Sequence, residues 1–168
     1  MTYSTVMHPG IQVGTIVLDT SGVSISLSSP KVSISTITWG TSEQGSSTIS
    51  SNNIVLSANK KYLLQATLSH SISNDFNDDQ KIRFYDETNS SWLGKHGVLT
   101  SNYEAMGSIE KTRADESARA IIINEGSARN VSLKYSGTTD QSFTVGDKPT
   151  TGTFSYLTVY GRIEIWEF

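Results

Sequence analysis

Apolar and polar residues alternate along most of this chain with a period of two, which is typical of β-strands that bury one face. The clearest examples are residues 23–27, 62–68, 81–85 and 131–135, and residues 11–18 are a further strand candidate. Turn-forming residues separate about nine or ten such short segments, and no helical segments alternate with them. The pattern predicts an all-β, antiparallel sandwich or barrel.

Several segments carry more specific expectations. Residues 120–123, a continuous apolar run, predict a strand that is buried on both faces. The two VSIS segments, 23–26 and 32–35, predict a hairpin or meander, and a change of apolar parity near Ser35 predicts a β-bulge. Residues 40–53 are polar and serine-rich, which predicts a long loop. Residues 108–119 favour equally a short helix or an irregular loop.

The segment 156–168, YLTVYGRIEIWEF, predicts a strand without a polar face. Aliphatic side chains occupy one face: Leu157, Val159, Ile163 and Ile165. Aromatic side chains occupy the other face: Tyr156, Tyr160 and Trp166. An antiparallel strand with a solvated side carries polar residues there, so we expect both faces to be covered, one of them by another subunit. The expected subunit interface consists of Tyr156, Tyr160, Arg162, Trp166 and Phe168.

Length and composition narrow the classes further. The 168 residues predict a single β-sandwich domain, 11–168, preceded by an N-terminal arm, 1–10. The chain contains no cysteine, which excludes disulfides and thiol chemistry. A net charge of −3 argues against general binding to nucleic acid or to anionic membranes. The first residues have no basic region followed by an apolar run, so we expect no signal peptide, and no apolar stretch approaches the length of a membrane helix.

An acidic segment is the one candidate metal site. Asp75, Asn77 and Asp79 match the first three ligand positions of a calcium loop, and Asp86 falls at the twelfth position. Gln80 stands where such a loop has glycine, and a strand pattern follows. The alternative is a solvated turn whose side chains bond their own backbone. No other cofactor is expected.

Catalytic signals are absent from the sequence, and we expect no enzymatic activity. The histidines do not form an HExxH motif, and no GxSxG elbow surrounds any serine. Trp39, Trp92 and Trp166 are candidates for stacking on sugar rings, but their places in strand patterns favour a role in the core.

Two segments carry a family resemblance. Residues 54–68, IVLSANKKYLLQATL, resemble the polar turn and following strand of C1q/TNF-like jelly rolls, and the terminal YLTVYGRIEIWEF resembles the closing strand of those domains. Tyr160 and Gly161 echo in part an aromatic–glycine pair near the end of that superfamily. The resemblance implies a jelly-roll sandwich assembled as a homotrimer, with the last strand near the threefold axis.

The serine- and threonine-rich, cysteine-free composition also resembles virion proteins of tailed bacteriophages. A short arm before a compact head resembles a capsid decoration (cement) protein. This implies a virion protein, assembled in the host cytoplasm, that binds the major capsid protein through arm residues Thr2, Tyr3, Val6 and Met7. The alternatives are a receptor- or carbohydrate-binding head of a tail fibre and a small enzyme such as a polysaccharide depolymerase.

Overall fold

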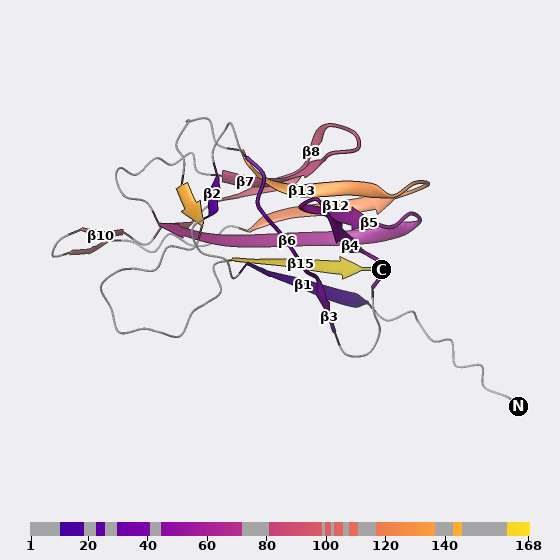
Figure 1. Ribbon diagram of the computed structural model, residues 1–168, viewed down its shortest axis with the longest axis horizontal. Coiled ribbons are helices and arrows are strands. Elements are labelled where there is room, and N and C mark those ends of the chain that lie inside the picture. The colour runs from indigo at the N-terminus through magenta and orange to yellow at the C-terminus, as the bar shows by residue number, and fades with distance from the viewer. Residues whose placement is uncertain are drawn as a thin grey trace, which may run out of the picture.

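The computed structural model describes eleven segments of the chain: residues 11–18, 23–25, 30–40, 45–71, 81–98, 100–101, 103–105, 108–110, 117–136, 143–145 and 161–168. All regular secondary structure in these segments is β-strand (Figure 1). Ten strands form one antiparallel, strongly curled sheet. The all-β, antiparallel prediction is therefore confirmed.

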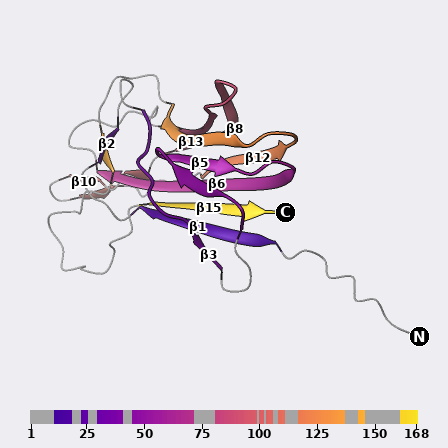
Figure 2. The ribbon, with the colours of Figure 1, turned by 45° about the vertical axis from the view of Figure 1, so that its right-hand side comes forward.

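The sheet has two halves of five strands. In spatial order the first half is β3 (Thr38–Trp39), β1 (Gln12–Leu18), β15 (Gly161–Glu167), β6 (Lys60–Ser71) and β12 (Ala118–Asn124). The second half continues with β8 (Ser91–Val98), β7 (Lys81–Asp86), β13 (Arg129–Tyr135), β5 (Asn53–Leu56) and β4 (Thr48–Ser50). Figure 2 shows β1, β15 and β6 side by side, with β13 and β5 of the second half across from them.

Five short strands lie off this path. β2 (Val23–Ile25) and β14 (Phe143–Val145) pair with each other, and β14 also pairs with the end of β6. β9 (Thr100–Ser101) pairs in parallel with β6, whereas β10 (Tyr103–Ala105) and β11 (Ser108–Glu110) form a separate two-stranded sheet.

The core fills the inside of the curl and draws on both halves. Every apolar side chain at the alternate positions Tyr62, Leu64, Ala66 and Leu68 of β6 is buried, as the alternation predicts. Ile163 and Ile165 of β15 lie beside them, and the second half contributes Ile54, Ile82, Phe84 and Leu133. Because both halves bury one face in the same core, their other faces point away from each other.

Strand β8 joins the two halves of the sheet, because it pairs with β7 of the second half and with β12 of the first. Its register with β7 shifts between Ile82 and Phe84, and it meets β12 at the pair Arg119–Lys95. Gly94 takes a positive φ of 62° inside this irregularity, and a Cβ there would lie 2.0 Å from the carbonyl oxygen of Arg119. Arg83 donates from Nε to the carbonyls of Leu93 and Gly94 and so satisfies backbone groups that leave the ladder.

Four local expectations can be compared with the structure. β2 pairs with β14, so the predicted hairpin between the two VSIS segments is wrong. The predicted 40–53 loop contains a strand, β4. Within 108–119 residues 108–110 and 118–119 belong to β11 and β12, so the helix alternative is wrong for them, and residues 111–116 lie outside the described segments. Near Ser35 the burial pattern shifts as the parity change requires, because Ser35 and Thr36 are exposed between buried Ile34 and partly buried Ile37, but residues 32–37 belong to no strand, so the predicted β-bulge is not seen.

Candidate functional site

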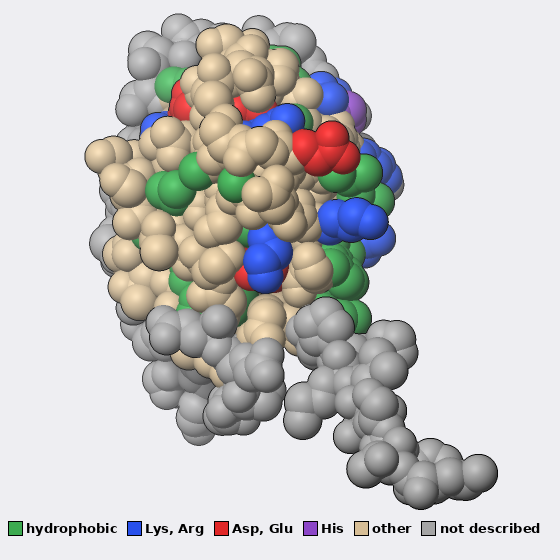
Figure 3. Space-filling model, turned by 90° about the vertical axis from the view of Figure 1, so that its right-hand side faces the viewer, with side chains coloured by type: hydrophobic (Ala, Val, Ile, Leu, Met, Phe, Trp, Pro, Cys, Tyr) green, Lys and Arg blue, Asp and Glu red, His purple; other side chains and the backbone are tan. Residues whose placement is uncertain are grey.

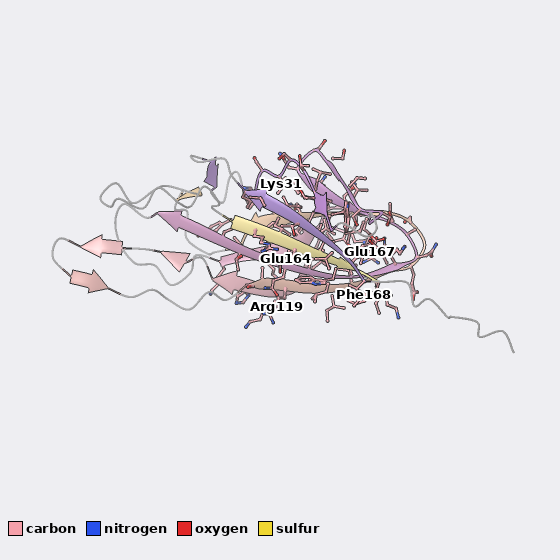
Figure 4. All side chains as sticks on the ribbon, turned by 90° about the horizontal axis from the view of Figure 1, so that it is seen from below. Lys31, Arg119, Glu164, Glu167 and Phe168 are labelled. Carbon is pink, nitrogen blue, oxygen red and sulfur yellow. The ribbon has the colours of Figure 1, made fainter. Side chains whose placement is uncertain are left out.

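Strand β15 has one face in the core and one face outside. Ile163 and Ile165 are fully buried, which confirms the aliphatic core face. Trp166 is partly buried on the opposite face, and Phe168, just past the strand, is 51% exposed. Of the predicted interface residues, the structure therefore places Arg162, Trp166 and Phe168 on one outer face. Figure 4 shows Glu164 and Phe168, which belong to this face, along β15.

Strand β12 contributes the most exposed apolar residues of that outer face. The expectation that 120–123 is buried on both sides is wrong, because only Ala120 and Ile122 point into the core. Ile121 is 80% exposed and Ile123 is 55% exposed. An apolar run alone does not distinguish a two-sided core strand from a strand with a bare apolar face.

The register of the strands joins these residues into one surface. Val13, Trp166, Leu63 and Ile121 form one row across β1, β15, β6 and β12. The next row contains Phe168, whose backbone bonds that of Lys61, and Ile123, which is paired with Lys61. We name as the outer apolar band the seven residues Ile11, Val13, Leu63, Ile121, Ile123, Trp166 and Phe168. Hydrophobic side chains adjoin Lys and Arg along the right-hand side of Figure 3.

A charged row borders the outer apolar band. It runs from Thr15 through Glu164 and Gln65 to Arg119 and Lys95. Glu164 forms an ion pair with Arg162 at 2.9 Å. Arg119 and Lys95, by contrast, place like charges directly opposite each other on neighbouring strands. With Lys61, the described part of this face carries four cations and one carboxylate, a net charge of +3.

Other predicted site residues lie outside the described segments. These are Tyr156 and Tyr160 of the interface, Thr2, Tyr3, Val6 and Met7 of the arm, and Asp75, Asn77 and Asp79 of the calcium loop. Asp86, the expected twelfth position, is buried, accepts hydrogen bonds from the backbone of Thr88 and Asn89 and from the Asn89 side chain, and forms an ion pair with Arg129. Both of its oxygens therefore hold the β7–β8 turn. Within the described residues, no three histidine or carboxylate side chains come together as a metal site.

A buried carboxylate that the sequence did not reveal is Glu167 of β15, which is 2% exposed. Ser46 donates to it from its backbone nitrogen at 3.0 Å and from Oγ at 2.8 Å, and Lys60 Nζ lies 3.2 Å away. Burial alone would raise the pKa of Glu167, but these hydrogen bonds and the lysine hold the pKa below its usual value. Glu167 thereby fastens the segment between β3 and β4, the two edge strands of the sheet, to the end of β15.

The outer face of the second half is polar and ordered by an ionic network. Glu87 accepts bonds from Lys31 at 3.1 Å, from Lys134 at 3.0 Å and from Ser132 at 2.8 Å. Burial would raise the pKa of Glu87, but the bonds from Ser132, Lys134 and Lys31 hold it below its usual value. Figure 4 places Lys31 and Arg119 on opposite sides of the molecule, so this network lies away from the outer apolar band.

Comparison with known proteins does not assign the chain to a family. In the described segments no helix is long and apolar enough to cross a membrane. No protein-family model and no curated protein sequence matches the chain.

Proposed function

We propose that this protein is a non-enzymatic structural protein that works as a homotrimer, with the outer apolar band buried between copies. The observation that carries the proposal is the concentration of exposed apolar side chains on one sheet face: Ile11, Val13, Ile121, Ile123 and Phe168 are between 37% and 80% exposed. Contiguous exposed apolar surface rimmed by charged residues is typical of a protein–protein interface.

Charge favours a ring over a twofold dimer. The described part of the face carries a net charge of +3. A twofold interface would bring two positive faces together. A heterologous interface instead brings this face against a different surface of the next copy, and a closed heterologous interface forms a ring. A trimer is the ring that the C1q/TNF-like resemblance implies.

The proposal also includes a jelly-roll fold and a biological role. We take the two halves of the curled sheet as the two layers of a jelly-roll sandwich, since they share one core and are joined at β8. The resemblance to phage virion proteins then makes the trimer a capsid decoration protein that binds the major capsid protein. Calcium is not needed for this role, and the acidic segment lies outside the described residues.

The substitution Ile121→Asp tests the interface. Ile121 is 80% exposed in the single chain, so the change should alter the free energy of unfolding of the monomer by about 0.5 kcal/mol or less. Burying the new carboxylate among the apolar side chains of the band in the interface costs several kcal/mol, so the trimer should dissociate. Sedimentation equilibrium measures the result.

Asn130→Asp is the matched control, because it adds the same charge at an exposed position on the opposite outer face. It should leave the trimer intact. A trimer that persists in Ile121→Asp would place the interface elsewhere. Binding of the wild-type protein to empty, expanded phage capsids then tests the decoration role separately, and absence of any capsid binding by a confirmed trimer would refute that role.

A further inference from the structure

An exposed tryptophan stands on the polar outer face of the second half. Trp92 of β8 lies opposite Tyr85 of β7 and is 42% exposed. The two ring centroids are 5.0 Å apart and the ring planes meet at 77°. In such an edge-to-face pair Tyr85 covers at most one face of the indole. A large part of the Trp92 ring therefore reaches solvent while one neighbour fixes its orientation.

The support behind this pair is itself fixed. Lys134 Nζ lies 3.7 Å from the centroid of the Tyr85 ring. Lys134 is in turn held by Glu87, which also binds Lys31 and Ser132. An aromatic platform held by such a network loses little side-chain freedom when a ligand binds. The network thus preorganises the surface around Trp92.

A hydrogen-bonding group is anchored along the same strand. Arg83 donates from Nε to the carbonyls of Leu93 and Gly94, the two residues that follow Trp92. Within the described segments its terminal amino groups have no hydrogen-bond partner. A guanidinium group held in this way keeps its terminal amino groups available to bind a carboxylate through two parallel hydrogen bonds.

We infer that this surface, the Trp92 platform with Arg83, binds a saccharide that carries a carboxylate, such as a uronate unit. The C–H face of the sugar stacks on the indole, and the sugar carboxylate binds the free end of Arg83. Lys31 and Lys134 both pair with Glu87, and Arg83 lies opposite Lys134 in the register of β7 and β13, so these described residues carry more positive than negative charge and favour an anionic sugar over a neutral one. The exposed turn beside it, Thr88 to Ser91, offers further hydroxyl and amide groups. This inference stands independently of the proposed assembly.

Titration of the full chain with three uronate hexasaccharides, of galacturonate, of mannuronate and of hyaluronan type, tests the inference by calorimetry. At least one should bind, and neutral maltohexaose should bind at least about fivefold more weakly. Trp92→Ala should weaken binding about tenfold and Trp92→Phe less, since the smaller ring keeps part of the stacking surface. Val17→Ala is the matched control, because Val17 is also 42% exposed but lies on the other half of the sheet.

Three outcomes would overturn the inference. The first is that none of the uronate hexasaccharides binds at millimolar concentration. The second is equal binding by the wild type and a Trp92→Ala variant whose unfolding midpoint is unchanged. The third is that a hexaglutamate peptide binds as tightly as the best uronate, because the surface would then recognise an acidic protein segment and not a sugar.

Discussion

Gly94→Ala should destabilise the protein by about 3 kcal/mol or more. Two effects add at this position. A side chain at φ 62° costs about 1–2 kcal/mol because of its left-handed backbone. The added Cβ would also lie 2.0 Å from the carbonyl oxygen of Arg119 and 2.7 Å from Cα of Ala120, so β8 and β12 would have to separate. The change therefore acts where the two halves of the sheet meet.

Gly126→Ala is the matched control for this prediction. Gly126 also has a positive φ, of 92°, but a Cβ there would meet no atom within 4 Å. Gly126→Ala should lower the free energy of unfolding only through the cost of the left-handed backbone, by about 1–2 kcal/mol. Urea unfolding of the two variants at equal protein concentration gives the difference. Equal losses of stability would show that the close approach of β8 to β12 at Gly94 does not constrain the fold.

Glu167→Gln should cost about 2–4 kcal/mol at neutral pH. The carboxylate accepts bonds from the backbone and side chain of Ser46 and from Lys60, all of which are donors. A glutamine amide would place its own N–H groups against some of them, and the charge that faces Lys60 would be lost. The segment that links β3 and β4 should then come loose from the end of β15.

The contribution of Glu167 should also depend on pH in a definite direction. Its pKa is lowered in the folded protein, so the stabilisation is complete above the unfolded value near 4.5 and declines as the pH falls through the lower folded pKa. The difference in the free energy of unfolding between wild type and Glu167→Gln should be constant near neutral pH and shrink below about pH 4.5.

Chemical unfolding between pH 7 and pH 3 measures this difference. Glu125→Gln is the control, because Glu125 is exposed at a turn and its replacement should change stability by about 0.5 kcal/mol or less. A difference between wild type and Glu167→Gln that grows on acidification would contradict the assigned role of this carboxylate.

The strands with strict alternation were predictable from the sequence. In β6 and β7 the apolar positions point inward as the period-two pattern requires, and Ile163 and Ile165 fix the inner face of β15. Part of the candidate interface followed from the same pattern, because Trp166 must lie opposite those residues. Its extension across the sheet did not, since Ile121 and Val13 join Trp166 only through a register set by non-local pairing.

Polar contacts between distant segments were not predictable. Glu167 and Ser46 are separated by 121 residues, and no local signal marks either as a partner. The same holds for Glu87, whose partners come from β13 and from the segment before β3. Such bonds follow from the path of the chain and not from any short pattern. The prediction that residues 120–123 are buried on both faces was wrong for a related reason, because no local pattern shows whether anything covers their outer face.

Native mass spectrometry of the full chain measures directly whether the protein is a homotrimer. At about 50 µM we expect one species of about 55 kDa, three times the 18.3 kDa chain. The same experiment on Ile121→Asp should give the 18.3 kDa chain alone. A wild-type protein that remains a monomer at this concentration would refute assembly through the outer apolar band.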